Sequence, residues 1–281
     1  MVRISSTLYY FFVSFTLLTA CKSSKMPTSS SKNITDSITT KHVVLEQDTA
    51  VAKVDSLIIE IQDSVEISVH RLIKDTLTII GVGDIMMGTN FPSENYLPPN
   101  KGKGLLSDVD SILLDADVTF GNLEGVILDD GGNAKYCKNP KICYIFRSPE
   151  YMVQNLVDAG FDVMSTANNH AGDFGNPGRK NTMRVLDSLG ISHAGLQVKP
   201  FDMFMVDGMK YGFAAFAPNT GTMSINDIEK AKEIVAHLDS LNDVVIVSFH
   251  GGAEGSKYQR VTRKNEYFYG ENRGNVYKFA H

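Results

Sequence analysis

The sequence predicts an α/β domain over residues 76–281, in which central β-sheets are flanked by layers of helices. Uninterrupted apolar runs occur at Leu77–Val82, Val118–Phe120 and Val244–Phe249, and such runs are typical of strands in a parallel sheet. Segments with helical periodicity lie between them, so strands and helices alternate along the chain. Because polar residues directly follow several strands, we expect a site at the carboxyl ends of those strands.

The expected elements follow in order, with recognisable end signals. Gly83 breaks the first strand, and the apolar spacing of residues 104–117 predicts a helix before the strand at Val118–Phe120. Residues 126–147 lack periodicity and are interpreted as a long loop over the site, after which Ser148 and Pro149 predict a helix start. The remaining expected elements are a helix ending at Gly160, a strand at 161–166, a helix ending at Gly190, a strand at 191–194, a hairpin turning at Asp207-Gly208, a helix at 228–241 and the strand Val244–Phe249.

The N-terminal 75 residues are predicted to lie outside this domain. Residues 1–20 contain a short apolar run of signal-peptide length, and the run ends Leu-Thr-Ala before Cys21, which resembles the lipobox of bacterial lipoproteins. Cys21 would then be acylated, although an uncleaved hydrophobic anchor is the alternative. Residues 21–75 begin with a Ser/Thr/Lys-rich tether that is mostly disordered, and the alternation around 65–69 allows an edge strand or hairpin. We therefore expect a lipid-anchored, extracytoplasmic protein of the bacterial cell envelope.

Composition restricts the expected partners and the cross-links that could stabilise the domain. The formal net charge of −5 provides no basic footprint, so nucleic acid is not an expected partner. Cys137 and Cys143 lie six residues apart in the long loop, where outside the cytoplasm they form a disulfide or remain two free thiols. A structural zinc site is not expected, because no second pair of ligands lies nearby.

Four predicted strands end in residues that can bind metal. These residues are Asp84, then Asn122 with Glu124, then Asn169 with His170, and finally His250. Each has an ordinary structural interpretation when taken alone, such as a helix cap or a surface acid. Their joint position at strand ends instead indicates a site for a divalent metal ion of borderline hardness, such as Mn, Fe or Zn. Such a metal would polarise a phosphoryl or acyl oxygen and acidify water.

Four motifs give a resemblance to a known family. The segments GVGDIMMG at 81–88, GNLEG at 121–125, TANNHAGDFG at 166–175 and HGGAEG at 250–255 resemble the successive motifs of the capsule-synthesis CapA family, also called the poly-γ-glutamate synthesis family. That family is similar in turn to the calcineurin-like metallophosphoesterases. The resemblance implies their layered fold, with strand ends that hold two metal ions.

The same resemblance implies roles for individual residues. Asp84 would bind the first metal, although Met86 stands where the phosphoesterases have a histidine. Asn122 occupies the place of their bridging aspartate, so Glu124 would supply the carboxylate instead. The other implied roles are metal ligation by Asn169 and His250, protonation of the leaving oxygen by His170, and orientation of His170 by Asp173, whose alternative is a helix N-terminal cap.

The resemblance also implies a further Gly-His-x-His motif beyond His281. We therefore expect the domain to lack its C-terminal part, or its remaining ligands, and to bind metal weakly. One hypothesis is an envelope-anchored hydrolase in capsule biosynthesis, acting on an anionic capsule polymer or a phosphorylated envelope precursor. The other is a non-catalytic component of the capsule synthesis or export machinery. The basic, tyrosine-containing segment Lys257–Tyr269 could contact such a polymer, or be an ordinary solvated face.

Overall fold

This computed structural model describes residues 51–54, 57–61, 67–71, 76–140 and 143–281. The chain divides into two compact units, Met1–Ile73 and Lys74–His281. In the first unit, β1 (Val51–Val54), β2 (Leu57–Ile61) and β3 (Ile67–Arg71) form an antiparallel sheet, one strand more than a hairpin. The signal peptide and Cys21 lie outside the described residues. Among the helices of the described chain, none is both long enough and apolar enough to cross a membrane.

The second unit contains a parallel four-stranded sheet with the order β4-β5-β8-β9. Its strands are β4 (Ile79–Ile85), β5 (Val118–Leu123), β8 (Val163–Ser165) and β9 (Ser192–Ala194). The apolar runs of the sequence therefore predicted parallel strands correctly. Two strands are longer than expected, because β4 continues past Gly83 to Ile85 and β5 continues past Phe120 to Leu123. A register shift between Gly81 and Asp84 lets β4 continue through its glycine.

A second sheet has the order β10-β11-β12. The strands β10 (Phe201–Val206) and β11 (Met209–Phe216) form the expected hairpin, and β12 (Val244–Phe249) runs parallel to β11. Asp207 and Gly208 both have positive φ, at 51° and 75°, as a type I′ turn requires. The crossover from β11 to β12 passes through α4 (Ile228–Asp239), which begins with an Asp227 cap.

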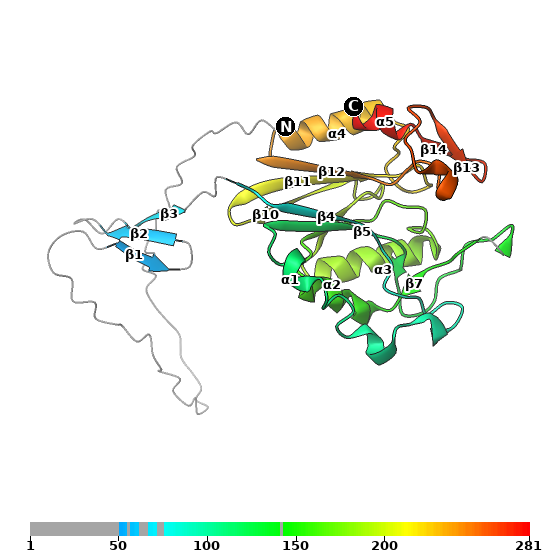
Figure 1. Cartoon of the computed structure of the whole chain (residues 1–281), viewed down its shortest axis with the longest axis horizontal. Helices are drawn as coiled ribbons and strands as arrows, with labels where there is room; N and C mark the ends of the chain where they lie inside the picture. Colours follow the sequence, from blue (N-terminus) through cyan, green and yellow to red (C-terminus); the bar gives the residue numbers. More distant parts are fainter. Residues whose placement is uncertain (1–50, 55–56, 62–66, 72–75, 141–142) are drawn as a thin grey trace, which may run out of the picture. The chain divides into compact units, whose positions relative to one another are not determined.

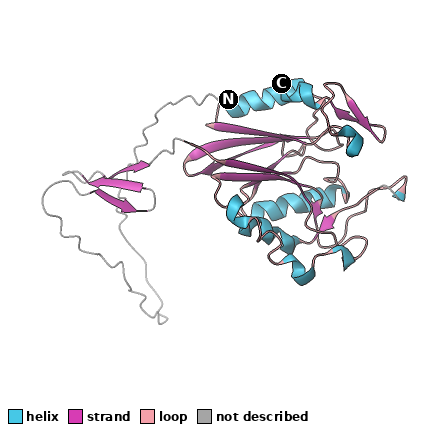
Figure 2. Ribbon diagram, in the orientation of Figure 1, coloured by secondary structure: helices cyan, strands magenta, loops and turns pink. Residues whose placement is uncertain are grey.

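The two sheets stack face to face between layers of helices (Figure 1). Small and aromatic side chains of both sheets fill the space between them, including Val163, Ala194, Phe213 and Ala215. The outer face of the first sheet packs on α2 (Gln154–Asp158) and α3 (Gly175–Ser188), and that of the second packs on α4 and α5 (Val276–Ala280). Figure 2 shows the resulting helix–sheet–sheet–helix layers. The predicted layered α/β architecture is thus confirmed.

Two predicted helices differ from the structure. Residues 104–117 form only the short α1 (Asp110–Leu113), because Gly104 has positive φ and the residues after it form turns, in which the Ser107 N–H donates to the Gly104 carbonyl at 3.1 Å. Ser148 caps no helix: it lies in β7 (Arg147–Ser148), which pairs with β6 (Val126–Ile127), and its hydroxyl donates to the Gly88 carbonyl at 2.6 Å. The remaining short elements are the 3₁₀ turns η1 (Glu94–Tyr96), η2 (Pro99–Gly102), η4 (Glu150–Val153) and η5 (Ser256–Tyr258), and the hairpin of β13 (Glu266–Phe268) and β14 (Glu271–Gly274).

Candidate metal centre and adjoining histidine

The bulge in β4 places Asp84 within the strand rather than after it. The register shift sets Asp84 opposite Asn122 of β5, so both side chains lie at the same level of the sheet. Glu124 follows β5 directly, and its backbone N–H donates to the carbonyl of Ile85 at 3.1 Å. Pairing of two neighbouring strands therefore brings the carboxylates of Asp84 and Glu124 together.

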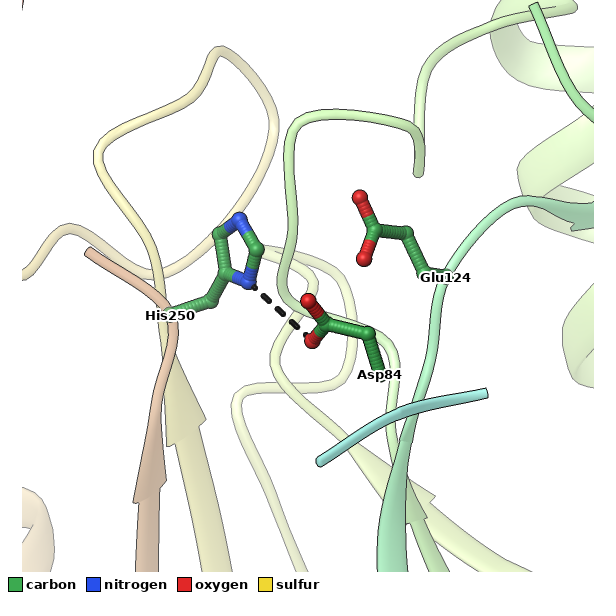
Figure 3. A group of neighbouring side chains, drawn as sticks. All are labelled: Asp84, Glu124 and His250. Carbon is green, nitrogen blue, oxygen red and sulfur yellow. Dashed lines mark ion pairs between the residues drawn. The ribbon is translucent and has the colours of Figure 1, made fainter. Parts of the chain in front are cut away.

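His250 reaches the same place from the other sheet. It follows β12, which pairs with β11, so His250 belongs to the second sheet and not to the sheet that carries Asp84 and Glu124. The reason is the hairpin β10–β11, which starts a second sheet and carries β12 across the sandwich. Potential ligand atoms of Asp84, Glu124 and His250 all lie within 4.8 Å of one another. Figure 3 shows these side chains converging, with His250 Nδ1 3.5 Å from Asp84 Oδ1.

The two carboxylates have very different proton affinities. Burial, followed by the hydrogen bond and negative charge of Asp84, raises the pKa of Glu124 to about 8. The pKa of Asp84 is lowered, chiefly by its hydrogen bond with His250, against the opposing effect of partial burial. The metal-free centre therefore holds a proton on Glu124 and keeps Asp84 ionised, as expected for two carboxyl groups that share one site.

Asn169, one of the expected ligands, contacts the His250 ring on the side away from Asp84. Its Oδ1 lies 2.7 Å from His250 Nε2, so it can accept a hydrogen bond from that nitrogen, while Nδ1 faces Asp84. A metal-binding histidine commonly has such a partner on its other nitrogen. The guanidinium of Arg273 lies beside the same nitrogen, with Nη2 at 3.2 Å. Sequence reasoning missed Arg273, because no spacing signal connects it to the strand ends.

An amide network supports the carboxylates from behind. Asn122 donates to Asp84 Oδ1 at 2.7 Å and accepts from Asn168 at 3.1 Å, so its side chain holds Asp84 in position. Asn168 also donates to the carbonyl of Leu123 at 2.9 Å and accepts from the His170 backbone at 3.0 Å. Asn168 is buried, and the polar run that contains it was its only sequence signal. Asn122, one of the expected ligands, and Asn168 thus connect Asp84 to the chain around His170 through hydrogen bonds.

His170 is held by a buried carboxylate beside this centre. Asp173, which is completely buried, lies 2.7 Å from His170 Nδ1 and accepts the backbone N–H of Phe146 at 2.7 Å. Lys135 forms an ion pair with the other oxygen of Asp173 at 2.6 Å. The alternative of a helix cap does not apply, because Phe174 is the N-cap of α3 and the cap makes no side-chain hydrogen bond. The opposite nitrogen, His170 Nε2, lies 3.5 Å from Glu124 Oε1.

The long loop supplies two of these contacts. Lys135 approaches Asp173 from one arm, and the Phe146 ring packs on the His170 ring from the other, at 4.3 Å between centroids. A disulfide joins Cys137 to Cys143 between these arms, which is one of the two states that the sequence allowed. The loop therefore covers the histidine side of the centre, and Lys135 is a second residue that sequence reasoning missed.

The donor set fits a divalent ion of borderline hardness. Two carboxylates and one imidazole nitrogen converge, and burial together with the neighbouring Asp84 carboxylate raises the pKa of Glu124, so a bound cation would offset the cost of ionising Glu124. Met86, at the position of the phosphoesterase histidine, is 56% exposed and adds no ligand of that kind. Within the described residues, one such group of side chains occurs, which provides donors for one ion.

Comparison with known proteins gives the family. The family model described as bacterial capsule synthesis protein PGA_cap matches residues 78–267. The chain is 29% identical over 200 residues to the capsule biosynthesis protein CapA of Bacillus anthracis, which covers 64% of this chain and 47% of that protein. It is 33% identical over 132 residues to an uncharacterized protein of Sinorhizobium fredii, covering 43% of this chain and 25% of that protein.

The chain thus spans about half, or less, of the length of these curated relatives. Among solved structures, a 5'-nucleotidase candidate from Staphylococcus aureus aligns with a TM-score of 0.38 and 18% identity, over 73% of this chain and 42% of that one. The family assignment rests on the family model, whose match includes all four strand-end motifs and covers more than half of the chain. The chain belongs to the bacterial capsule synthesis protein family.

Proposed function

We propose that this chain is a metal-dependent hydrolase of capsule biosynthesis, which acts on an anionic capsule polymer or a phosphorylated envelope precursor. The observation that carries the proposal is the convergence of Asp84, Glu124 and His250 beside an oriented histidine, His170. Carboxylate and imidazole side chains from three different strands converge although burial and the neighbouring carboxylate raise the pKa of Glu124, and such perturbed groups are typical of functional sites.

In this proposal Asp84, Glu124 and His250 hold the metal. The chemistry that a divalent ion supplies when bound is polarisation of a phosphoryl or acyl oxygen and acidification of water. Asn122 and Asn169 fix the ligand orientations, since each contacts a ligand side chain at 2.7 Å. These amides carry no charge of their own, so they orient Asp84 and His250 without adding to the repulsion within the site.

His170 is the proposed proton donor to the leaving group. Its Nδ1 is tied to Asp173, so Nε2 is the nitrogen that faces the centre, on the side of Glu124. Water adds to the phosphoryl or acyl centre, the bond to the leaving atom breaks, and the proton on Nε2 passes to that atom. The proton lost by the water returns to His170, so the residue is regenerated for the next cycle.

We also infer that the protein is attached to the bacterial envelope through a lipid on Cys21, with the domain outside the cytoplasm. The support is the short apolar run that ends in a small residue before this cysteine. Cys21→Ser should move the protein from the membrane fraction to the soluble fraction of cells, and a substitution of Cys137 should leave it membrane-bound. Continued membrane attachment of the Cys21 variant would contradict the lipid anchor.

The experiment that tests the enzyme proposal combines metal analysis with hydrolysis. The purified 281-residue chain is loaded with Mn, Fe or Zn, and stoichiometry is measured together with release of product from poly-γ-glutamate and from phosphomonoesters. We expect one ion for each chain, lost in Asp84→Ala and retained in Asp130→Ala, an exposed acid in the loop. His170→Gln should retain metal but lose hydrolysis. Absence of stoichiometric metal in the unsubstituted chain would refute the proposal.

One observation favours the alternative of a non-catalytic capsule assembly component. Arg273 places its guanidinium 3.2 Å from His250 Nε2, so a positive charge already lies beside the carboxylates. In that case Arg273 would stabilise a degenerate site, and Arg273→Gln would lower stability without any effect on metal binding. Metal affinity that increases in Arg273→Gln would instead favour the enzyme, because the guanidinium then competes with the ion.

A further inference from the structure

A groove with mostly apolar walls lies along β4, directly beside the candidate centre. Its volume is about 790 Å³, and its walls come from β4, η1 and α1 and from the segments that follow β4 and precede α1. Among the described residues that line it, Asp84 alone carries a charge at neutral pH. A concave, mostly apolar site of this size with few polar groups is the usual form of a small-molecule site. We call it the β4 groove.

Large apolar side chains of the β4 groove remain exposed to water. Leu105, Val109 and Ile112 belong to the apolar stripe that predicted a longer helix, and they are 42%, 43% and 62% exposed. Met86 and Tyr96 line the same groove and are exposed as well. Single exposed apolar side chains are ordinary, whereas a group of them around one groove is typical of a binding surface.

Asp84 connects the β4 groove to the candidate centre. It lines the groove, and it is also one of the three side chains that converge with Glu124 and His250. Met86 and Met87 follow it along the chain and continue the wall of the groove. A ligand whose ionic end lies at the centre would therefore place its remaining part against apolar walls. The ligand that fits both surfaces is amphiphilic, with an ionic head and an apolar tail.

The lining of the β4 groove favours a flexible hydrocarbon chain as that apolar part. A sugar, a peptide or a nucleobase carries donors and acceptors that need partners when water is excluded. Among the described lining residues, the polar side chains besides Asp84 are those of Asn95 and Tyr96, so few such partners are present. The unbranched side chains of Met86 and Met87 adapt to ligands without a fixed shape, as a hydrocarbon chain requires.

We propose that the β4 groove binds the hydrocarbon chain of a phosphorylated lipid, whose phosphate head lies at the Asp84–Glu124–His250 centre. The head depends on a bound cation, because the Asp84 carboxylate alone would repel a phosphate. This part of the proposal rests on the proposed function, and it narrows the substrate from a phosphorylated envelope precursor to a phosphorylated lipid. Binding of the hydrocarbon chain requires only the groove, so the two parts can be tested separately.

The test measures the affinity of the 281-residue chain for decyl phosphate and for hexyl phosphate by isothermal titration calorimetry. Both are used below the concentrations at which they form micelles, once with Mn²⁺ and once with EDTA. Decyl phosphate should bind at least about tenfold more tightly than hexyl phosphate in both conditions, because its additional methylenes leave water. Mn²⁺ should tighten the binding of both by a similar factor, because it acts on the head that they share.

A pair of double variants locates the binding of the chain. Leu105→Ser combined with Ile112→Ser should weaken binding of decyl phosphate by about tenfold and reduce its advantage over hexyl phosphate. The control combines Val198→Ser with Leu241→Ser, which are exposed outside the lining of the β4 groove, and should change the affinity by less than about twofold. Because all the substituted side chains are exposed, thermal unfolding should show that both variants remain folded.

Three results would overturn the proposal. Equal affinities for the two phosphates, or equal losses in the two double variants, would exclude the β4 groove as the site of the hydrocarbon chain. Self-association of the unsubstituted chain that Leu105→Ser with Ile112→Ser abolishes would assign the groove to a second copy instead. A chain that binds Mn²⁺ without any gain in affinity for decyl phosphate would exclude the head from the centre. If the chain binds no Mn²⁺, the proposed function fails, and the comparison in EDTA still decides whether the groove binds a hydrocarbon chain.

Discussion

Replacement of Glu124 by glutamine should have opposite effects on stability with and without metal. In the metal-free protein the pKa of Glu124 is raised from 4.5 to about 8, so the folded state holds a proton that the unfolded state releases above pH 4.5. Stability must therefore decrease as the pH rises from 4.5 to about 8. Glutamine cannot ionise, and Glu124→Gln should remove this decrease.

The magnitude follows from the pKa difference. A shift from 4.5 to about 8 corresponds to an upper bound of roughly 5 kcal/mol at pH 9, at 1.36 kcal/mol for each unit. Asp84 is partly exposed, and water screens its contribution, so we expect about 2 kcal/mol. In EDTA the variant should therefore exceed the unsubstituted chain in free energy of unfolding by about 2 kcal/mol at pH 9, and match it at pH 5.

Metal should reverse the order of the two proteins. An ion at 100 times its dissociation constant stabilises the folded state by about 2.7 kcal/mol, and Glu124→Gln should lose most of this gain because one anionic ligand is removed. Urea unfolding at pH 5, 7 and 9, with EDTA or with Mn²⁺, measures both effects. Glu229→Gln, on the exposed face of α4, is the control and should keep the pH slope. A variant less stable than the parent at pH 9 in EDTA would refute the reasoning.

Three further predictions concern buried residues of the domain. Asp173→Asn leaves Lys135 and His170 without their buried partner and should lower the free energy of unfolding by about 3 kcal/mol in urea. Gly195→Ala should lower the free energy of unfolding by about 2 kcal/mol, because Gly195 has φ +122° and an added Cβ would lie 2.9 Å from the backbone nitrogen of Ala167. The control is Gly83→Ala, where an added Cβ meets no atom within 4 Å, and its stability should be nearly unchanged. Burial lowers the pKa of His193 below its usual 6.5, so below pH 6.5 the unfolded chain binds a proton more readily than the folded one. The free energy of unfolding should therefore fall as the pH drops below 6.5, and His193→Gln should weaken this pH dependence in urea unfolding.

Several elements could be predicted from local sequence because one local rule decides each of them. The strand Val244–Phe249 was predicted with its observed bounds, since a short run rich in β-branched and aromatic residues beside turn residues favours a strand over a helix. The Asp207-Gly208 turn was predicted because both residues tolerate the positive φ that a type I′ hairpin needs. The helix over residues 104–117 was predicted too long, because apolar periodicity does not show that Gly104 has positive φ and that the next residues form turns.

The C-terminal end of β4 was predicted wrongly for a different reason. The sequence suggested that Gly83 ends the strand, whereas a bulge lets pairing with β5 resume at Asp84. Bulges depend on the partner strand, so no local pattern in β4 alone announces one. Lys135 and Arg273 were missed for a related reason. Lys135 reaches the site from the long loop and Arg273 from strand β14 of a short hairpin, and in neither case does spacing along the chain indicate contact with the strand ends.

The sequence by itself determined which side chains the strand ends carry, and therefore the ligand chemistry of Asp84, Glu124 and His250. It also determined the family, through four motifs that occur in order. Only the tertiary structure decided their arrangement: His250 arrives from a second sheet, and Asn169 contacts the histidine ring. The physical reason is that strand identity depends on local side-chain pattern, whereas sheet membership and the proton affinity of Glu124 depend on long-range pairing and burial.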